Sequence, residues 1–146
     1  MNRPAALIQA IDCLRIHVPD LEAGLRFYRD QLGHDLIWRT ATAAGLRLPH
    51  GSAELVIQTE RDELEIDLLV DSVETAAERI VSAGGRVIVP PFDIQIGRCV
   101  VVCDPWGTQL VLLDMSKGAL LTDQEGRVVG TRLADSPATH DPHSLT

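Results

Sequence analysis

The chain has 146 residues and a formal net charge of -8, so its surface is expected to repel phosphate backbones, and we predict no nucleic-acid partner. Hydrophobic residues make up 45% of the chain, which is enough for the core of one domain and argues against global disorder. No apolar run approaches the roughly 18 to 20 residues that span a bilayer, and the N-terminus lacks the apolar segment of a signal peptide, so we expect a cytoplasmic protein with no membrane partner.

The first half of the chain predicts a strand, a helix and three further strands. Residues 8–18 have β-like alternation, and Asp20 is a good N-cap for a helix that ends near residue 32. Leucines recur along one stripe of that helix, and Gly33 ends it. Three short strands are expected after it, at residues 35–43, 45–48 and 53–59.

The second half predicts the same series. Residues 63–70 form a strand, and Ser72 caps a helix over residues 73–83. A strand over residues 86–89 is expected to break at Pro90 and Pro91, and a loop then covers residues 92–97. The half closes with a hairpin over residues 98–114, in which the sequence Asp104-Pro105-Trp106-Gly107 has the chemistry of a tight turn.

The two halves are related by a shift of fifty-two positions, which overlays Val18 on Val70 and Gly33 on Gly85. The sequence therefore predicts an α+β fold built from two βαβββ modules in tandem, over residues 8–62 and 63–116. Residues 117–146 are expected to add a small C-terminal hairpin and a mobile tail.

Two segments resemble a known family. They are VPDLEAGLRFYRDQLG, at residues 18–33, and DPWGTQLVLLD, at residues 104–114. Both are similar to the vicinal oxygen chelate superfamily, which includes glyoxalase I, extradiol dioxygenases and bleomycin-resistance proteins. The likeness covers about residues 8–116 as one domain, and it implies a curved mixed sheet around a cleft. It indicates the fold more than the function, since one scaffold hosts many chemistries.

The resemblance also implies where a metal ion would be held. In metal-using members, the first and last strands of each half contribute the ligands, and these positions are occupied here by Cys13, Val56, Glu65 and Val111. Because valine has no donor atom, we expect neither a family-type metal site nor another cofactor. The alternative is a divalent ion (zinc, nickel, manganese or iron) held by Cys13, Glu65 and, in a shifted register, Glu54.

Without a metal, the polar residues on the inward faces of the first strands become the candidate site. Alternation places Arg15 and His17 on the face of Cys13, and it places Glu65 and Asp67 on the matching face of the second half. Arg15 could bind a carboxylate or phosphate, and His17 beside Glu65 or Asp67 could act as a general base. The alternative is that Arg15 forms a structural ion pair with Glu65 or Asp67. Further candidate ligand-binding residues are Gln58, Arg98, Trp106 and Gln109.

Three functions remain open at this point. The first is a metal-free binding protein of the bleomycin-resistance type, commonly a homodimer, which sequesters a small molecule between the halves. The acidic net charge favours a cationic ligand, whereas Arg15 favours an anionic group on it. The second is a metal-dependent lyase or dioxygenase of the glyoxalase type, and the third is a metal-free acid–base enzyme that uses His17 with Glu65 or Asp67. Whether the modules pair within one chain or across a dimer also remains open.

Overall fold

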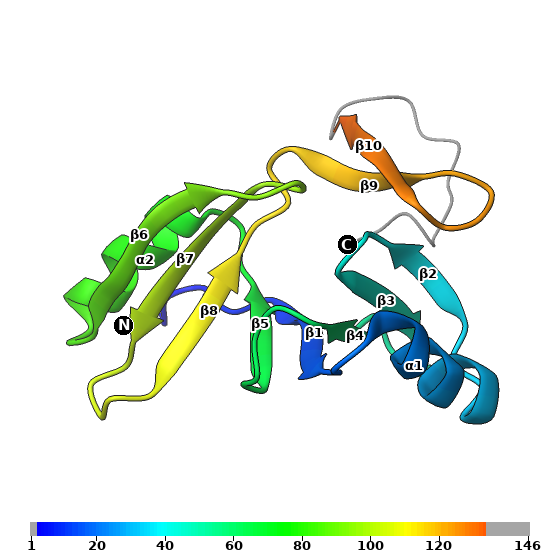
Figure 1. Ribbon diagram of the computed structural model, residues 1–146. Helices are drawn as coiled ribbons and strands as arrows, with labels where there is room; N and C mark the ends of the chain where they lie inside the picture. The colour runs from blue at the N-terminus through cyan, green and yellow to red at the C-terminus, as the bar shows by residue number, and fades with distance from the viewer. Residues whose placement is uncertain (1–2, 134–146) are drawn as a thin grey trace.

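The computed structural model describes residues 3–133, and it shows a strongly curved sheet with helices on its outer face (Figure 1). Eight strands form this sheet in the order β2-β3-β4-β1-β5-β8-β7-β6, and two further strands form a separate small sheet, β10-β9. The α+β class and the two βαβββ modules are thereby confirmed. No helix among the described residues is long and apolar enough to cross a bilayer.

The chain order of the elements repeats between the modules. The first module contains β1 (Ala10–His17), α1 (Leu21–Leu25), η1 (Arg26–Gln31), β2 (Leu36–Arg39), β3 (Ala43–Arg47) and β4 (Glu54–Gln58). The second contains β5 (Glu65–Leu69), α2 (Val73–Ser82), β6 (Arg86–Asp93), β7 (Arg98–Cys103) and β8 (Gln109–Leu113). The small sheet is made by β9 (Gly118–Thr122) and β10 (Val128–Leu133), and the tail expected after Ala134 lies outside the described residues.

The modules pair within one chain. Strands β1 and β5 run antiparallel at the centre of the sheet, with Cys13 opposite Asp67 and Arg15 opposite Glu65. Each of these strands also pairs in parallel with the last strand of its own module, β4 for β1 and β8 for β5. The inward faces of β1, β4, β5 and β8 therefore lie next to one another, and all four strands come from the same chain.

Both helices begin at the predicted caps, but the first one changes its geometry. The side chain of Asp20 accepts a hydrogen bond from the Ala23 N–H, and that of Ser72 accepts one from the Thr75 N–H. After one α-helical turn, the first helix continues as the π-helix η1, in which the Leu32 N–H donates to the Phe27 carbonyl at 3.0 Å. The apolar stripe predicted a helix here without distinguishing the two hydrogen-bond patterns.

The prediction that Pro90 and Pro91 end a strand is wrong, because β6 runs through both residues to Asp93. Strand β6 is the edge of the sheet and pairs only with β7, and the register shifts between Val89 and Phe92. A proline costs no ladder hydrogen bond where its missing N–H would face outward or lie in a bulge. The expected loop over residues 92–97 is correspondingly reduced to a turn, which the hydrogen bond from the Ile94 N–H to the Gly97 carbonyl closes at 3.0 Å.

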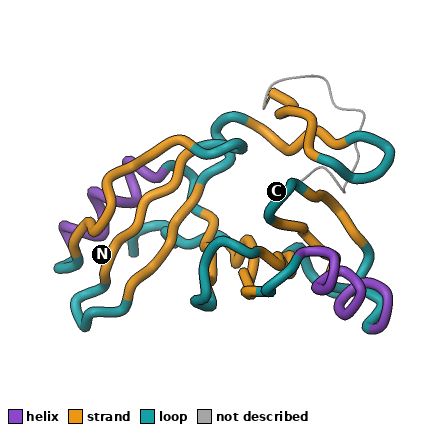
Figure 2. Tube along the Cα trace, in the orientation of Figure 1, coloured by secondary structure: helices purple, strands orange, loops and turns teal. Residues whose placement is uncertain are grey.

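Three clusters of buried side chains hold the fold together. One packs α1 against the first module, around Leu25 and Ile57, and another packs α2 against the second module, around Val73 and Val100. The third lies on the opposite, concave side of the sheet, where Leu120 of β9 joins side chains of both modules. The β9–β10 hairpin accordingly lies across the concave side, away from the helices (Figure 2).

Candidate functional site

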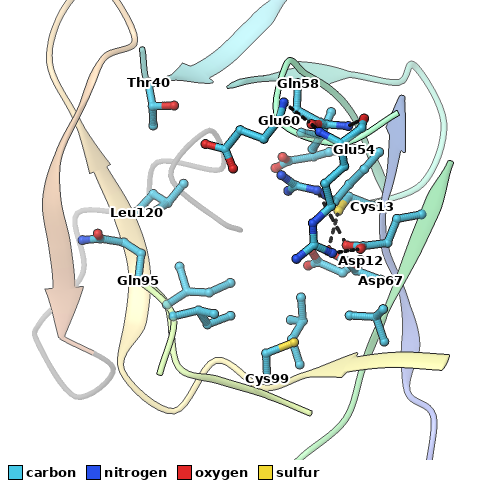
Figure 3. A pocket seen from close by; sticks show the side chains of 18 of the residues that line it. Asp12, Cys13, Thr40, Glu54, Gln58, Glu60, Asp67, Gln95, Cys99 and Leu120 are labelled. Atoms are coloured by element: carbon cyan, nitrogen blue, oxygen red, sulfur yellow. Dashed lines mark hydrogen bonds and ion pairs between the residues drawn. The ribbon is translucent and has the colours of Figure 1, made fainter. Parts of the chain in front are cut away.

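The concave side of the sheet encloses a cavity of about 370 Å³. The inward side chains of β1, β4, β5 and β8 line it on one side, and the β6–β7 turn and the β9–β10 hairpin line it on the other (Figure 3). The register explains this arrangement, since Cys13 lies beside both Glu54 and Asp67, while Asp67 lies beside Val111. Side chains from four neighbouring strands therefore meet at one place.

The sequence missed Asp12, which also lines this cavity. Strict alternation places Asp12 on the face opposite Cys13. In the structure, the pairing of β1 with β5 shifts between Ile11 and Cys13, as in a β-bulge. A bulge turns an extra side chain toward the same face, and nothing in the sequence of β1 marks its position.

A cluster of acidic groups occupies the polar end of the cavity. The thiol of Cys13 donates a hydrogen bond to Asp67 Oδ2 at 3.4 Å, and the Asp67 side chain is only 6% exposed. Burial, followed by the hydrogen bond and the charge of the neighbouring Glu65, raises the pKa of Asp67 to about 8, against the opposing effects of Arg15 and Cys13. The pKa of Asp12 is also raised, chiefly by burial.

Two guanidinium groups offset part of this negative charge. Arg15 Nε lies 3.7 Å from Glu65 Oε2, and Arg61 Nη1 lies 3.1 Å from Glu65 Oε1. The structural ion pair between Arg15 and Glu65, considered as an alternative from the sequence, is therefore present. Both arginines line the cavity, so this pairing still leaves them close to any ligand.

The Cys13 thiol is poorly suited to act as a nucleophile. Burial raises its pKa, and the carboxylates of Asp67 and Asp12 raise it further. The thiolate is the reactive form of cysteine, and a raised pKa keeps Cys13 in the thiol form. Cys13 therefore serves here as a hydrogen-bond donor to Asp67. The second cavity cysteine, Cys99, has its pKa raised to about 12, mainly by burial.

A tryptophan forms one wall of the cavity. Trp38 Nε1 donates a hydrogen bond to Glu54 Oε1 at 2.7 Å, and both side chains are buried. The indole lies directly over Gly45 of β3, where any Cβ atom would collide with the ring. Gly45 thus makes room for Trp38, and Trp38 orients Glu54 at the cavity.

Apolar side chains also line the cavity. Val56 of β4 and Val111 of β8 lie beside Arg15 and Asp67 in the sheet, and Leu120 and Val128 come from the β9–β10 hairpin. The hairpin is fixed to both modules: the Arg39 N–H donates to the Gly126 carbonyl at 2.7 Å, and Gln95 Nε2 donates to Thr131 Oγ1 at 2.5 Å. Figure 3 shows Leu120 and Gln95 on the side of the cavity opposite Cys13 and Asp67.

The structure brings most of the predicted site residues to this cavity. Those that line it are Cys13, Arg15, Glu54, Gln58, Glu65, Asp67 and Gln109. The amide of Gln58 is already engaged, since its oxygen accepts from the backbone N–H groups of Glu60 and Arg61. Gln58 therefore shapes the rim of the cavity through the loop that follows β4.

Three predicted residues do not line the cavity. His17 Nε2 lies 3.5 Å from Asp62 Oδ1, so the ion-pair partner of His17 is Asp62 rather than Glu65 or Asp67. Arg98 pairs with Glu74 at 2.6 Å and also with Asp93. Trp106 is 87% exposed in the β7–β8 turn. The strand pattern predicted His17 beside Glu65 or Asp67, whereas the structure pairs it with Asp62, which precedes β5.

The four positions at which the family resemblance implies metal ligands all line the cavity, but they do not suit a metal ion. Cys13 and Glu65 carry donor atoms, whereas Val56 and Val111 carry none. Glu65 is in addition paired with two arginines. Two remaining donors fall short of the three or four protein ligands that a stable site normally has.

Comparisons with known proteins agree with this architecture. Residues 11–113 match the model of a family described as a glyoxalase-like domain. The proteins named "Putative glyoxylase CFP32" of Mycobacterium tuberculosis and Mycobacterium bovis are each 32% identical over 74 residues, which is 48% of this chain. The match spans only 28% of the length of these curated relatives.

Solved structures show the same fold at low sequence identity. Methylmalonyl-CoA epimerase from Mycobacterium tuberculosis is 18% identical with a TM-score of 0.65, over 77% of this chain and 92% of that one. A methylmalonyl-CoA epimerase of Streptomyces coelicolor, in complex with 2-nitronate-propionyl-CoA, is 20% identical with a TM-score of 0.62, over 75% and 99%. These likenesses support the fold and do not identify a ligand.

Proposed function

The chain belongs to the glyoxalase-like domain family, and on this basis we propose that it binds a small organic molecule in the cavity between its two modules, without the metal ion that many members of the wider superfamily use. The observation that carries this proposal is the cavity itself. Its volume of about 370 Å³ falls in the range of small-molecule sites, and apolar walls with a few convergent polar groups are typical of such sites.

Two apolar residues support the metal-free part of the proposal. The family resemblance implies metal ligands at Val56 and Val111, which line the cavity and carry no donor atom. Their side chains instead offer apolar contact area to a ligand, each methylene buried being worth about 0.8 kcal/mol. The chemistry of the cavity thus favours binding of an organic body over coordination of an ion.

The comparisons support a ligand but not its identity. The Streptomyces coelicolor epimerase holds a small-molecule ligand on the same fold, a CoA ester by its description. Since the present chain shares only 20% identity with it, that ligand does not transfer. We infer only that the concave side of this fold is a suitable place for a small molecule.

A second candidate function is metal-free acid–base catalysis. It is favoured by Asp67, whose pKa of about 8 would let the carboxyl group accept and return a proton near neutral pH. His17, the base expected from the sequence, pairs with Asp62 on the outside of this cluster. Any such chemistry would therefore depend on Asp67 and Glu65.

The two tryptophans provide a direct test of binding. Trp38 lines the cavity and Trp106 is exposed, so a Trp106→Phe protein has a single tryptophan that reports on the cavity. Chelator-treated Trp106→Phe protein is titrated with phenylbutanol, phenylbutyrate and phenylbutylamine, and we expect saturable changes in Trp38 fluorescence for at least one of them. Val111→Phe should abolish these changes by filling the cavity, whereas Val129→Phe, on the exposed side of β10, should not.

Two results would contradict the proposal. Binding that appears only after zinc, nickel, manganese or ferrous iron is added would support a metal-dependent enzyme of the glyoxalase type. Titrations that leave Trp38 unchanged with every probe, or changes that persist in Val111→Phe, would show that the cavity is not the binding site.

A further inference from the structure

We propose that the cavity recognises a protonated amine, which Asp67 binds beside Glu65 while the apolar body of the ligand packs against the valines and the β9–β10 hairpin. This inference rests on the proposed function, because it names the class of ligand that the same cavity would take. It follows from a buried carboxylate oxygen that the protein leaves without a partner.

Asp67 lacks the hydrogen bonds that a buried carboxylate needs. Its Oδ2 accepts one weak bond from the Cys13 thiol, at 3.4 Å, and its hydrogen bond with Glu65 favours the neutral acid rather than the carboxylate. No N–H or O–H group of the described residues donates to its buried Oδ1. An unpartnered buried polar atom destabilises the folded protein, and it does so more strongly when it is charged. A ligand that donates to this oxygen would offset that destabilisation.

Asp114 shows how the same protein satisfies a buried carboxylate when the role is structural. It is 2% exposed and accepts four hydrogen bonds, from the N–H groups of Val73, Arg98 and Ser116 and from the Ser116 hydroxyl. Although burial alone would raise the pKa of Asp114, these hydrogen bonds hold it below its usual value. Asp67 receives no comparable set of donors, and it lies in a cavity.

Three of the other four cavity carboxyl groups have protein partners, and the fourth, Asp12, is only half-buried, which singles out Asp67. Glu65 pairs with Arg15 and Arg61, Glu54 accepts from Trp38, and Glu60 accepts from the Thr42 hydroxyl. In total, five carboxyl side chains and two guanidinium groups line the cavity. This excess of acidic groups favours a cationic ligand over an anionic one.

Binding of a cation at Asp67 should release a proton. The titratable or charged groups around Asp67 are Asp12, Cys13 and Arg15 on β1, Glu65 on β5 and Cys99 on β7. Without a ligand, burial and Glu65 favour the neutral acid of Asp67 near pH 7. An R–NH₃⁺ group would replace that proton, giving a carboxylate–ammonium pair, and the proton would pass to the buffer. The amine should therefore bind more tightly as the pH rises from 6 to 8.

Three probes that share one apolar body test the inference: phenylbutylamine, phenylbutanol and phenylbutyrate. Their affinities for the full-length protein are measured at pH 7.5 by calorimetry and by Trp38 fluorescence. We expect the amine to bind at least about 10-fold more tightly than the alcohol, as a charge-assisted hydrogen bond to a buried carboxylate would give. The binding enthalpies measured by calorimetry in phosphate and in Tris should differ, because up to one proton per bound amine is taken up by the buffer and the two buffers have different ionisation enthalpies.

Substitution of Asp67 separates this contact from the overall charge of the protein. Asp67→Asn should lower the affinity for phenylbutylamine at least about 10-fold and change the affinity for phenylbutanol by less than about 3-fold. Asp30→Asn makes the same side-chain change on the exposed surface of η1, and it should leave both affinities unchanged.

The outcomes distinguish this inference from the proposed function. If phenylbutanol or phenylbutyrate binds as tightly as the amine, or if Asp67→Asn retains the preference for the amine, the inference is wrong while the cavity remains a binding site. If none of the three probes binds, the proposed function fails as well. Because the comparison of the amine with the alcohol uses the unmodified protein, the test does not depend on the folding of the variant.

Discussion

At the scale of single residues, the protein places two buried carboxyl groups in opposite environments. Asp114 sits among donors that stabilise its charge, at the start of α2 and the end of β8. Asp67 sits among other acids, where burial and Glu65 raise its pKa to about 8. A buried carboxylate that accepts several hydrogen bonds, as Asp114 does, stabilises the fold. A buried carboxyl group among other acids, as Asp67 is, destabilises the fold once it ionises. Such a cost at a cavity is typical of residues retained for binding or catalysis.

The stability of the protein should therefore depend on pH through Asp67. In the unfolded chain the group titrates near 3.8, and in the folded protein near 8. The neutral acid is thus favoured by folding, so its contribution is complete below pH 3.8 and is lost as the pH rises toward 8. We expect the free energy of unfolding of the wild type, relative to Asp67→Asn, to fall between pH 5 and pH 8 by at most about 1.4 kcal/mol per pH unit.

Urea denaturation at pH 5, 6.5 and 8 measures this difference. Asp30→Asn provides the control, since it removes an exposed carboxylate and should follow the wild type at each pH. Parallel curves for the wild type and Asp67→Asn would show that Asp67 titrates normally in the folded protein.

At the scale of elements, alternation along β1 and β5 predicted Arg15, Glu65 and Asp67, which line the cavity, and the family resemblance added Val56 and Val111 of β4 and β8. Alternation failed where the backbone departs from a regular pattern: a bulge adds Asp12, and the edge position of β6 tolerates Pro90 and Pro91. Sequence alone also missed the contribution of the C-terminal hairpin, because Leu120 and Val128 show no pattern that indicates which surface they would cover. That information exists only in the tertiary contacts of the hairpin.

The hairpin should open locally when the part of its attachment to the second module made by Thr131 is removed. Thr131 makes two hydrogen bonds with Gln95, accepting from Nε2 and donating to the backbone carbonyl at 3.1 Å. Thr131→Val keeps the shape of the side chain and removes both bonds, which are worth about 0.5–1.5 kcal/mol each when intact. Amide hydrogen exchange in β9 and β10 should accelerate by roughly 3- to 10-fold, while exchange in β7 and β8 stays unchanged. Equal acceleration in all four strands would indicate global destabilisation, and no acceleration would show that the hairpin is held elsewhere.

At the scale of the whole molecule, the duplicated plan was readable because both copies keep their caps and their helix-ending glycines. The sequence did not specify how the copies pair, since strands that pair within one chain have the same pattern as strands exchanged between two. The structure pairs β1 with β5 in a single chain, so one chain supplies every wall of the cavity described above. A homodimer, which the resemblance implies, stays a prediction.

Binding should accordingly be independent of the association state of the protein. We expect one ligand per chain and the same affinity for phenylbutylamine at protein concentrations above and below any dimer dissociation constant, because side chains of a single chain line the described cavity. Sedimentation velocity gives the association state across a dilution series, and Trp38 fluorescence of the Trp106→Phe protein gives the affinity at each step. Loss of binding on dilution to the monomer, with circular dichroism showing the fold intact, would mean that a partner chain orders the cavity. Unchanged binding would show that the two modules of one chain form a complete and independent site.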